Sequence, residues 1–370
     1  MPIPEQRDLE KTRGVLAEWL NGKVGATDVS VSEITGPAFT GFSNETLLFD
    51  ANWTDGGQPR EQGLVVRVAP TRHHLFLDPD FEFQHRVIQV LGERTDVSAP
   101  PMRWFEDDDR VLGAPFFVMD KLEGRVPGDS PPYTQAGWLL EDATPAQRRR
   151  VVESGLDAMA RIHAVDWKAL DLGFLDKQQY GAAGIEQQVN YYERYLEWTV
   201  QGRSVPVAEA ALAWVRANLP EHQEIGLCWG DARINNQMFD DDGNVVAVFD
   251  WEMVTLADPM MDLGWWLFLD RHFHEGMPAP RMDGFPTRDE MVTHYEKTRG
   301  VTARDLEFYE VFGGFRFAVI MMRIAHLLVE FELLPPDNDV ATNNAVTRVL
   351  ADMLDLEQPG PGMSNYAGAE

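Results

Sequence analysis

The sequence predicts an α+β protein built from two unequal parts, a small antiparallel sheet followed by a larger, mainly helical region. Three observations carry this prediction. Short segments of β type, separated by turn residues, fill roughly the first 120 residues. A run of chain breakers, Leu122–Gly128, follows. Beyond that run, most segments place apolar residues at every third or fourth position, which is the period of an amphipathic helix.

The first part is expected to consist of short strands accompanied by two helices. The turn signal Asp55-Gly56-Gly57 joins two of the strands directly, so we expect an antiparallel sheet and no β-α-β crossover. The predicted strands are 29–34, 45–53, 63–68, 102–105 and 114–119, and the predicted helices are 8–20 and 81–91.

The second part is expected to be helical, with strand signals confined to the neighbourhood of residues 229–252. Thr144 and Pro145 predict a helix start, because proline suits the first helical position and threonine suits the N-cap. The predicted helices are 145–165, 185–199, 207–218, 260–269, 288–298, 303–334 and 342–354. We therefore divide the chain into an N-terminal lobe (1–121), a C-terminal lobe (122–358) and a flexible tail rich in glycine and proline (359–370).

The formal net charge of −28 argues against nucleic acid and anionic membranes as partners, because both are negatively charged. A cationic substrate is compatible with this charge, and so is an acidic surface that serves only solubility. The apolar segments 263–269 and 317–322 are too short to span a bilayer, and the N-terminus lacks a signal-peptide pattern. The single cysteine, Cys228, excludes an internal disulfide. We expect a cytoplasmic protein, either a monomer or a homodimer.

The most informative segment is Trp229–Glu252. Asp231 and Asn236 are five residues apart, and Asp250 follows the run Val245–Phe249, where a buried strand is expected to end. Phosphoryl transfer needs a carboxylate that orients a hydroxyl, together with amide and carboxylate oxygens that bind Mg²⁺. The same spacing is also compatible with a β-hairpin that carries Asn and Asp in its turns.

Five segments, in order along almost the whole chain, resemble those of the aminoglycoside phosphotransferase and choline kinase-like family. The resemblance implies a protein-kinase-like fold of two lobes, ATP and Mg²⁺ as cofactors, and a small molecule with a hydroxyl group as the acceptor. The segments are Gly41–Leu48, Leu64–Val68, Gly113–Asp120 with Glu123-Gly124, Trp229–Asn236 and Asp250–Glu252.

The resemblance assigns the transfer chemistry to the C-terminal lobe. It implies that Asp231 is the catalytic base, which accepts the proton of the acceptor hydroxyl or orients that hydroxyl. It implies that Arg233 is a cation beside the transferred phosphoryl group. Asn236 and Asp250 are implied as the ligands of Mg²⁺.

The resemblance assigns nucleotide binding to the N-terminal lobe. The glycine-containing loop would cap the phosphates with backbone N–H groups. Arg67 would pair with the α- and β-phosphates, and the strand that ends near Met119 would present main-chain groups to adenine. The residues implied in this way are Gly41, Phe42, Ser43, Asn44, Arg67, Gln84, Phe117 and Met119.

Three positions depart from the family pattern. Trp229 stands where the family usually has histidine, at a position that is mainly architectural. Arg67 stands where lysine is common, and its planar guanidinium binds phosphate through a fork instead of a point charge. The glutamate that normally orients that lysine is matched by Gln84, with Glu82 two residues away. Gln84 would hydrogen-bond to Arg67 without forming an ion pair.

The acceptor and the activity leave alternatives open. An aminoglycoside is one acceptor class, and hydroxyacyl thioesters and other metabolites form another. A nucleotide-binding module without turnover would fit the three departures. A metal-dependent hydrolase that uses Asp231, Asn236 and Asp250 directly would lack the usual histidine ligands. The sequence does not distinguish ATP from GTP.

Several other residues are expected to be structural. His163 lies on the apolar face of a predicted helix, as a hydrogen-bonded core histidine does. Asp258-Pro259 is expected to begin the helix that contains Asp262. The aromatic residues that follow helical spacing and are expected to pack in the core are Tyr191, Tyr192, Tyr195 and Trp198.

Overall fold

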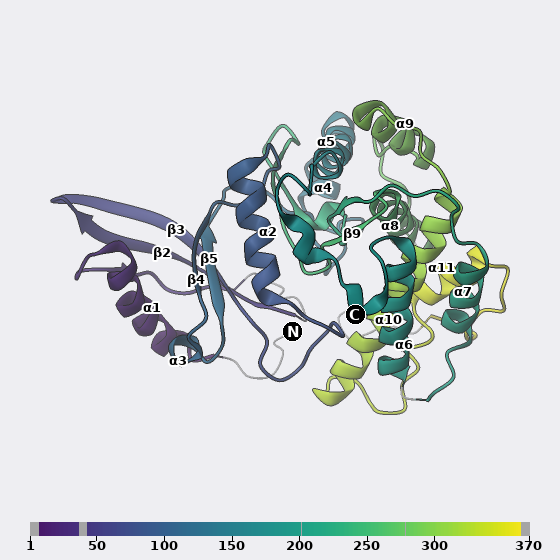
Figure 1. The fold of residues 1–370 in the computed structure, drawn as a ribbon, viewed down its shortest axis with the longest axis horizontal. Helices are drawn as coiled ribbons and strands as arrows, with labels where there is room; N and C mark the ends of the chain where they lie inside the picture. The colour runs from purple at the N-terminus through teal and green to yellow at the C-terminus, as the bar shows by residue number, and fades with distance from the viewer. Residues whose placement is uncertain (1–6, 37–42, 201, 278, 364–370) are drawn as a thin grey trace. The chain divides into compact units, whose positions relative to one another are not determined.

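The computed structural model describes residues 7–36, 43–200, 202–277 and 279–363, and it divides into two compact units (Figure 1). The first unit comprises residues 1–93 and 99–123, and the second comprises residues 94–98 and 124–370. The first unit contains an antiparallel sheet and the second is mainly helical. The predicted α+β class is therefore confirmed.

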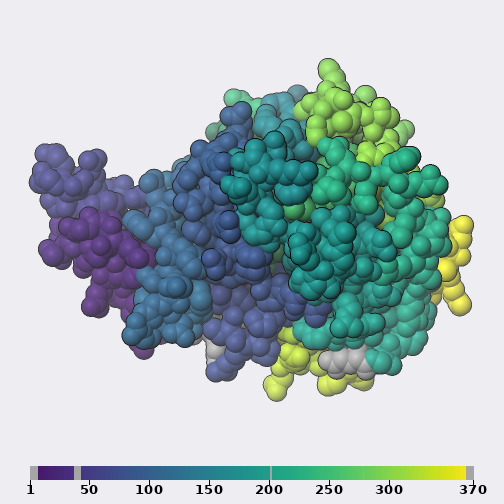
Figure 2. Space-filling model, viewed as in Figure 1, coloured from purple at the N-terminus to yellow at the C-terminus, as the bar shows by residue number. Residues whose placement is uncertain are grey.

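The strands of the first unit are β1 (Ser30–Val31), β2 (Glu45–Asp55), β3 (Gln58–Val68), β4 (Met102–Glu106) and β5 (Phe116–Asp120). They form one antiparallel sheet in the order β1-β2-β3-β5-β4. β2 and β3 make a long hairpin, and Gly56 and Gly57 in its turn both have positive φ, as the tight turns that suit strand twist require. The far end of this hairpin is exposed and projects from the unit (Figure 2).

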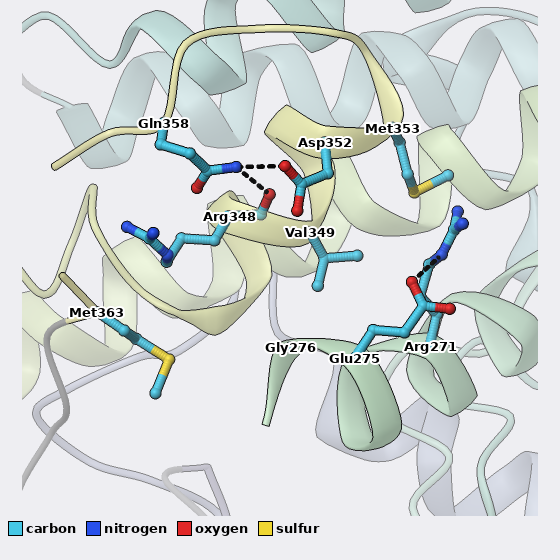
Figure 3. A pocket seen from close by; sticks show the side chains of 9 residues that line it. All are labelled: Arg271, Glu275, Gly276, Arg348, Val349, Asp352, Met353, Gln358 and Met363. Atoms are coloured by element: carbon cyan, nitrogen blue, oxygen red, sulfur yellow. Dashed lines mark hydrogen bonds and ion pairs between the residues drawn. The ribbon is translucent and has the colours of Figure 1, made fainter. Parts of the chain in front are cut away.

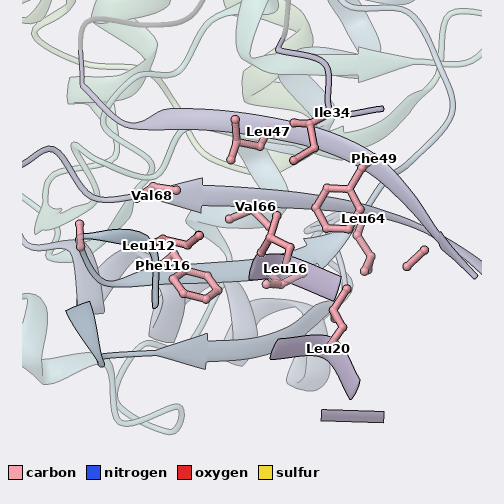
Figure 4. Close-up of a cluster of buried hydrophobic side chains, with 13 residues drawn as sticks. Leu16, Leu20, Ile34, Leu47, Phe49, Leu64, Val66, Val68, Leu112 and Phe116 are labelled. Atoms are coloured by element: carbon pink, nitrogen blue, oxygen red, sulfur yellow. The ribbon is translucent and has the colours of Figure 1, made fainter. Parts of the chain in front are cut away.

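The core of the first unit lies between one face of this sheet and α1 (Leu9–Val24). Leu16 and Leu20 of α1 are buried in a cluster with apolar side chains of β2, β3 and β5 (Figure 4). Side chains alternate between the two faces of a strand. Phe117 of β5 therefore points to the other face, where α2 (Phe81–Arg94) lies. The ring centroids of Phe117 and Phe81, in the first turn of α2, are 5.0 Å apart.

The second unit consists mainly of helices, with two short antiparallel strand pairs. The capping box at Thr144 and the proline at the first position of α5 are present as predicted. The strand pairs are β6 (Gly226–Cys228) with β9 (Thr255–Ala257) and β7 (Gln237–Phe239) with β8 (Val245–Val248). The helices are α4 (Trp138–Glu141), α5 (Pro145–His163), α6 (Ile185–Val200), α7 (Pro206–Ala217), α8 (Met260–Arg271), α9 (Arg288–Arg299), α10 (Leu306–Glu330) and α11 (Ala345–Met353).

The predicted long helices are present with shifted ends, the largest shift being the shorter extent of α10. The pair β6–β9 and the short helices α3 (Asp109–Leu112) and α4 are additional to the predicted elements. Segments of three or four residues are too short to display a hydrophobic period, which explains their absence from the prediction. Tyr191, Tyr192 and Tyr195 of α6 are buried, which confirms their predicted role in core packing.

α8 and α10 pack at very close range because glycines lie where they meet. A Cβ on Gly264 of α8 would lie 2.4 Å from atoms of Tyr309 in α10, and a Cβ on Gly313 would lie 3.2 Å from Cα of Trp265. By length and composition α10 would also pass for a membrane-spanning helix, but 78% of its most apolar window is buried inside the structure. It is the core helix of the second unit, and its packing fixes the side chains of α8.

Candidate functional site

The two strand pairs bring the predicted residues Asp231, Asn236 and Asp250 together in the second unit. Asp231 follows β6, Asn236 ends the 3₁₀ turn Ile234–Asn236 before β7, and Asp250 follows β8. The backbone N–H of Phe249 donates to the carbonyl oxygen of Asn236 at 2.8 Å. Nδ2 of Asn236 donates to Oδ2 of Asp231 at 2.7 Å. These two bonds join three chain segments into one site.

Three side chains hold the carboxylate of Asp231. Trp265 of α8 donates from Nε1 to Oδ1 at 2.9 Å. Arg233 Nε and Asn236 Nδ2 both donate to Oδ2, at 3.1 and 2.7 Å. An ionised carboxylate offers about four lone-pair sites, so these bonds occupy three of them. Within the part of the chain that the structure describes, the remaining site belongs to Oδ1, and the side chain of Asp231 is 14% exposed.

A buried carboxylate, Asp262 in the first turn of α8, fixes the backbone that precedes Asp231. Its Oδ2 accepts from the backbone N–H of Trp229 at 2.6 Å, and its Oδ1 accepts from that of Gly230 at 2.9 Å. His163 of α5 lies 3.0 Å from the same Oδ2 through Nε2, and its Nδ1 lies 2.7 Å from the hydroxyl of Tyr295. The expectation that His163 is a hydrogen-bonded core histidine is confirmed.

Gly230 occupies a position that no other residue would fill without movement. Its φ is +92°, and a Cβ there would lie 2.0 Å from the carbonyl oxygen of Met253. The carbonyl oxygen of Gly230 accepts from Nη2 of Arg316 at 2.7 Å. Arg316 comes from α10 and is 1% exposed, so the backbone next to the base is held by two different helices.

Trp229 joins the segment that carries Asp231 to the segment that carries Asp250. It is fully buried, and its indole Nε1 donates to the carbonyl oxygens of Phe249 at 2.8 Å and of Asp250 at 3.2 Å. Asp250 has a φ of +57°, a left-handed conformation that aspartate tolerates better than most residues. Trp229 therefore has an architectural role, as expected for a departure from histidine at this position.

The donor atoms of Asn236 and Asp250 fit a magnesium ion. A carboxylate only accepts hydrogen bonds, so the Asn236 atom that faces Asp231 is the amide nitrogen, and Oδ1 is left for a cation. Within the described part of the chain, no group of three or more His, Cys, Asp or Glu residues would hold a metal. Mg²⁺ commonly takes one or two carboxylates and completes its shell with water and phosphate. One carboxylate and one amide oxygen suit that pattern.

Arg233 bridges two carboxylates. Its Nη1 donates to Asp129 at 2.7 Å and its Nε to Asp231 at 3.1 Å. Burial opposes the charge of Arg233, but the two carboxylates outweigh burial and raise its pKa above the ordinary value. A guanidinium has five N–H donors, and these bonds use two of them. Among the described residues, Arg233 is therefore a fixed cation that uses two of its donors in these bonds.

The residues predicted to bind nucleotide lie in the first unit. Gly41 and Phe42 lie outside the described residues. Ser43 is partly exposed just before β2. Asn44 is buried beside it, and its Nδ2 donates to Oε1 of Gln84 in α2 at 2.9 Å. Gln84 therefore anchors the end of the predicted phosphate loop to α2.

The remaining nucleotide candidates lie on inner strands of the sheet. Arg67 is in β3, and Phe117 and Met119 are in β5, which pairs with a strand on either side. The backbone N–H groups of Asp120 and Lys121 donate to carbonyl oxygens within the unit at 3.0 and 2.9 Å. These two N–H groups are therefore occupied within the unit, and the contact of main-chain groups near Met119 with adenine stays a prediction.

Three residues of the site are absent from the sequence prediction: Asp129, Trp265 and Arg316. Trp265 and Arg316 contact residues 34 and 86 positions away, so no local pattern reveals these contacts. One signal was present in the sequence. An arginine inside an apolar helical run is expected to be buried, and a buried arginine needs partners.

A cavity of about 520 Å³ lies elsewhere in the second unit, between the end of α8, α11 and the chain after α11 (Figure 3). Two hydrogen bonds join polar side chains of its lining. Arg271 Nε donates to Glu275 at 2.7 Å, and Gln358 Nε2 donates to Asp352 at 2.5 Å. The residues predicted from the sequence do not line it, so it is separate from the candidate site.

Comparison with curated proteins shows similarity to parts of larger proteins. The chain is 27% identical over 345 residues to acyl-CoA dehydrogenase family member 10 of Mus musculus, covering 87% of this chain and 29% of that protein. It is 26% identical over 329 residues to family member 11 of Mus musculus, covering 86% of this chain and 39% of that protein. The chain thus spans well under half the length of these relatives.

Comparison with solved structures identifies the fold of aminoglycoside phosphotransferases, which confirms the predicted kinase-like architecture. A candidate aminoglycoside phosphotransferase of Ralstonia eutropha matches with a TM-score of 0.67 and 25% identity, over 92% of this chain and 96% of that chain. A thermostable mutant of aminoglycoside phosphotransferase APH(4)-Ia, in a ternary complex with AMP-PNP and hygromycin B, matches with a TM-score of 0.55 and 15% identity, over 91% and 98%. The sequence profile of the phosphotransferase enzyme family matches residues 40–300. The chain therefore belongs to the phosphotransferase enzyme family.

Proposed function

We propose that this protein transfers the γ-phosphate of ATP to a hydroxyl group of a small molecule, with Mg²⁺ and with Asp231 as the base. The observation that carries the proposal is the state of the Asp231 carboxylate. Three donors fix it, and one lone-pair site on Oδ1 is left to accept a hydrogen bond. Family membership supports the reaction class, and nucleotide bound to structural relatives such as APH(4)-Ia supports ATP as the donor.

The reaction follows from this arrangement. The acceptor hydroxyl donates its hydrogen bond to Asp231, which orients the oxygen toward the γ-phosphorus and takes the proton as the new O–P bond forms. The bond between the γ-phosphorus and the bridging oxygen breaks, and ADP leaves with the bonding electron pair. Asp231 then holds the proton at a carboxylate oxygen until it passes to solvent.

The neighbouring residues stabilise the charge that moves during this transfer. Asn236 and Asp250 would hold Mg²⁺, which supplies positive charge to the phosphate oxygens when it is bound. Arg233 keeps a fixed position through Asp129 and directs its remaining donors to the transferred group. In the first unit, Ser43, Asn44 and Arg67 are the described candidates for phosphate contacts.

A hydroxyacyl thioester is a second candidate acceptor, next to an aminoglycoside-like molecule. The observation that favours it is the name of the curated relatives, acyl-CoA dehydrogenase family members, which contain a region similar to this chain. An aminoglycoside is favoured by the ligands of structural relatives, such as hygromycin B. The formal net charge of −28 favours a cationic acceptor over an anionic thioester through long-range attraction.

A panel of acceptors tests the proposal directly. Purified protein with Mg-ATP is offered aminoglycosides, amino alcohols, and hydroxyacyl thioesters of coenzyme A, and the phosphorylated product is identified by mass spectrometry and ³¹P NMR. Asp231→Ala is expected to lower kcat by about 10²–10⁴-fold while ATP still binds, because only the base is lost. Asp242→Ala, an exposed aspartate in the β7–β8 turn, is the control that retains turnover.

Three results would count against the proposal. Near-normal turnover of Asp231→Ala on an identified acceptor would show that another group takes the proton. ATP binding without transfer to any acceptor would favour a nucleotide-binding module instead. Turnover that survives removal of divalent cations by EDTA would exclude the role given to Asn236 and Asp250.

A further inference from the structure

The base of the proposed reaction is contacted by a tryptophan from a distant helix. Trp265 lies in α8 and donates from its indole Nε1 to Oδ1 of Asp231 at 2.9 Å. We propose that Trp265 is a positioning residue that determines which lone pair of Asp231 receives the acceptor proton. This inference rests on the proposed function, because it takes Asp231 as the base.

The argument starts from the two oxygens of Asp231. Oδ2 accepts two hydrogen bonds, from Arg233 and Asn236, so both of its lone pairs are occupied. Among the described residues, Oδ1 accepts one bond, from Trp265, which leaves its second lone pair for the acceptor. The indole N–H therefore fixes the rotation of the carboxylate and leaves one defined direction for the acceptor hydroxyl.

The indole itself is held rigidly, which is the property a positioning residue needs. The guanidinium of Arg316 lies over the Trp265 ring at 4.6 Å from its centroid, and the ring of Phe317 lies 5.5 Å away. The close contact of Gly313 with Cα of Trp265 fixes the backbone at the same point. These three neighbours all come from α10, so the contact between α8 and α10 fixes the direction of the N–H.

Arg316 contacts both the backbone before Asp231 and the indole that donates to Asp231. Its Nη2 donates to the carbonyl oxygen of Gly230 at 2.7 Å, and its face packs on Trp265. Its Nε and Nη1 are buried without a hydrogen-bond partner among the described residues. Burial of an under-satisfied cation is costly, and the surrounding aromatic rings offset part of that cost through cation–π contacts. We infer that Arg316 orients the two groups it contacts, the carbonyl of Gly230 and the indole of Trp265.

This role predicts an effect on the rate of transfer and not on binding. An N–H that orients the base acts on the reacting geometry, so its loss lowers kcat and leaves KM for the nucleotide nearly unchanged. Loss of a merely structural tryptophan would lower the apparent kcat only by reducing the folded, active fraction, so kcat is referred to the folded fraction measured by circular dichroism for each variant.

Trp265→Phe and Trp266→Phe form a matched pair for the test. Both remove a buried indole from neighbouring positions of α8, but Trp266 packs toward Gly155 in α5 and has no bond to Asp231. The probe is Mg-ATP alone, and the transfer of phosphate to water is measured as phosphate release, so no identified acceptor is needed. Trp265→Phe is expected to lower kcat by about ten- to a hundredfold, the effect of a lost hydrogen bond to a charged group, with KM for ATP within about threefold of wild type.

The outcomes separate this inference from the function on which it rests. If Trp265→Phe has the same kcat as Trp266→Phe while Asp231→Ala is inactive, the positioning role is wrong and the proposed function stands. If Asp231→Ala releases phosphate at the wild-type rate, or the wild type transfers phosphate neither to water nor to any acceptor, the proposed function fails.

Arg316 provides a second test in case Trp265→Phe does not fold. Arg316→Met removes the cation over the indole, and Arg316→Lys keeps a cation and a donor. The inference predicts a reduced kcat at unchanged KM for Arg316→Met and partial recovery for Arg316→Lys. A wild-type kcat for Arg316→Met would overturn it.

Discussion

Gly230→Ala tests whether the backbone next to Asp231 is as tightly enclosed as the structure shows. Gly230 has a φ of +92°, and an added Cβ would lie 2.0 Å from the carbonyl oxygen of Met253. That neighbour is a backbone atom, so it cannot rotate away as a flexible side chain does. Either the peptide before Asp231 or the segment after Asp250 must move.

The expected loss of stability has two parts. A left-handed backbone costs an L-residue about 1–2 kcal/mol, and overpacking of a filled site costs about 1–3 kcal/mol. We expect Gly230→Ala to lower the free energy of unfolding by about 2–5 kcal/mol. Gly300→Ala is the matched control, because Gly300 has a φ of +72° and nothing lies within 4 Å of an added Cβ. It should cost only the first part, about 1–2 kcal/mol.

Urea denaturation at neutral pH, followed by circular dichroism, measures both free energies, and phosphate transfer is measured under native conditions. Gly230→Ala is also expected to lose about a hundredfold in kcat, because a shift of about 1 Å displaces the base. Gly300→Ala should retain turnover, since it caps α9 away from the site. Equal destabilisation of the two variants, or normal turnover of Gly230→Ala, would refute the close approach on which the reasoning depends.

Two further predictions concern pH and helix packing. Burial lowers the pKa of His272 from 6.5 to about 4, so the unfolded chain binds a proton that the folded chain excludes. The stability contribution is complete above pH 6.5 and is lost as the pH falls toward 4, by about 3 kcal/mol in total. His272→Phe should therefore flatten the pH dependence of unfolding in this range, and an unchanged slope would contradict the assignment. Gly264→Ala should destabilise the second unit by about 2 kcal/mol or more, because its Cβ would overlap Tyr309. Gly14→Ala, in an open position of α1, should stabilise the first unit by about 0.5–1 kcal/mol, and calorimetry of both variants checks the opposite signs.

The long helices and the hairpins could be predicted because their signals are local. α5 shows its start in Thr144-Pro145 and its buried face in a repeating apolar pattern. The β7–β8 hairpin shows its turn in the segment Asp240–Gly243. Such features depend on neighbours in sequence, so they can be predicted without knowledge of the tertiary fold.

The strand pair β6–β9 illustrates what local signals cannot supply. Gly226 pairs with Ala257 and Cys228 with Thr255 across a gap of almost thirty residues. A three-residue strand has too few side chains to reveal alternation. Directly after β6, the backbone of Trp229 and Gly230 is held by Asp262 from another element.

The candidate site also contains residues with local sequence signals and residues without them. Asp231, Asn236 and Asp250 were predicted from residue type and spacing, and a short turn and the β7–β8 hairpin bring their segments together. Their roles in catalysis stay predictions. The residues that hold them, Asp129, Trp265 and Arg316, were not predicted from the sequence. Asp129 bonds Arg233 across 104 positions, and a contact of that length leaves no trace in a single sequence.

The sequence by itself determined the class of the fold and the family, and it singled out the three residues around which the candidate site is described. The tertiary structure alone decided how those residues are held. The contact of α8 with α10, permitted by glycines, aims Trp265 at Asp231 and places Arg316 behind it. The physical reason is that residue types specify which chemistry is available, whereas the direction of a hydrogen bond depends on packing between helices that are distant in the chain.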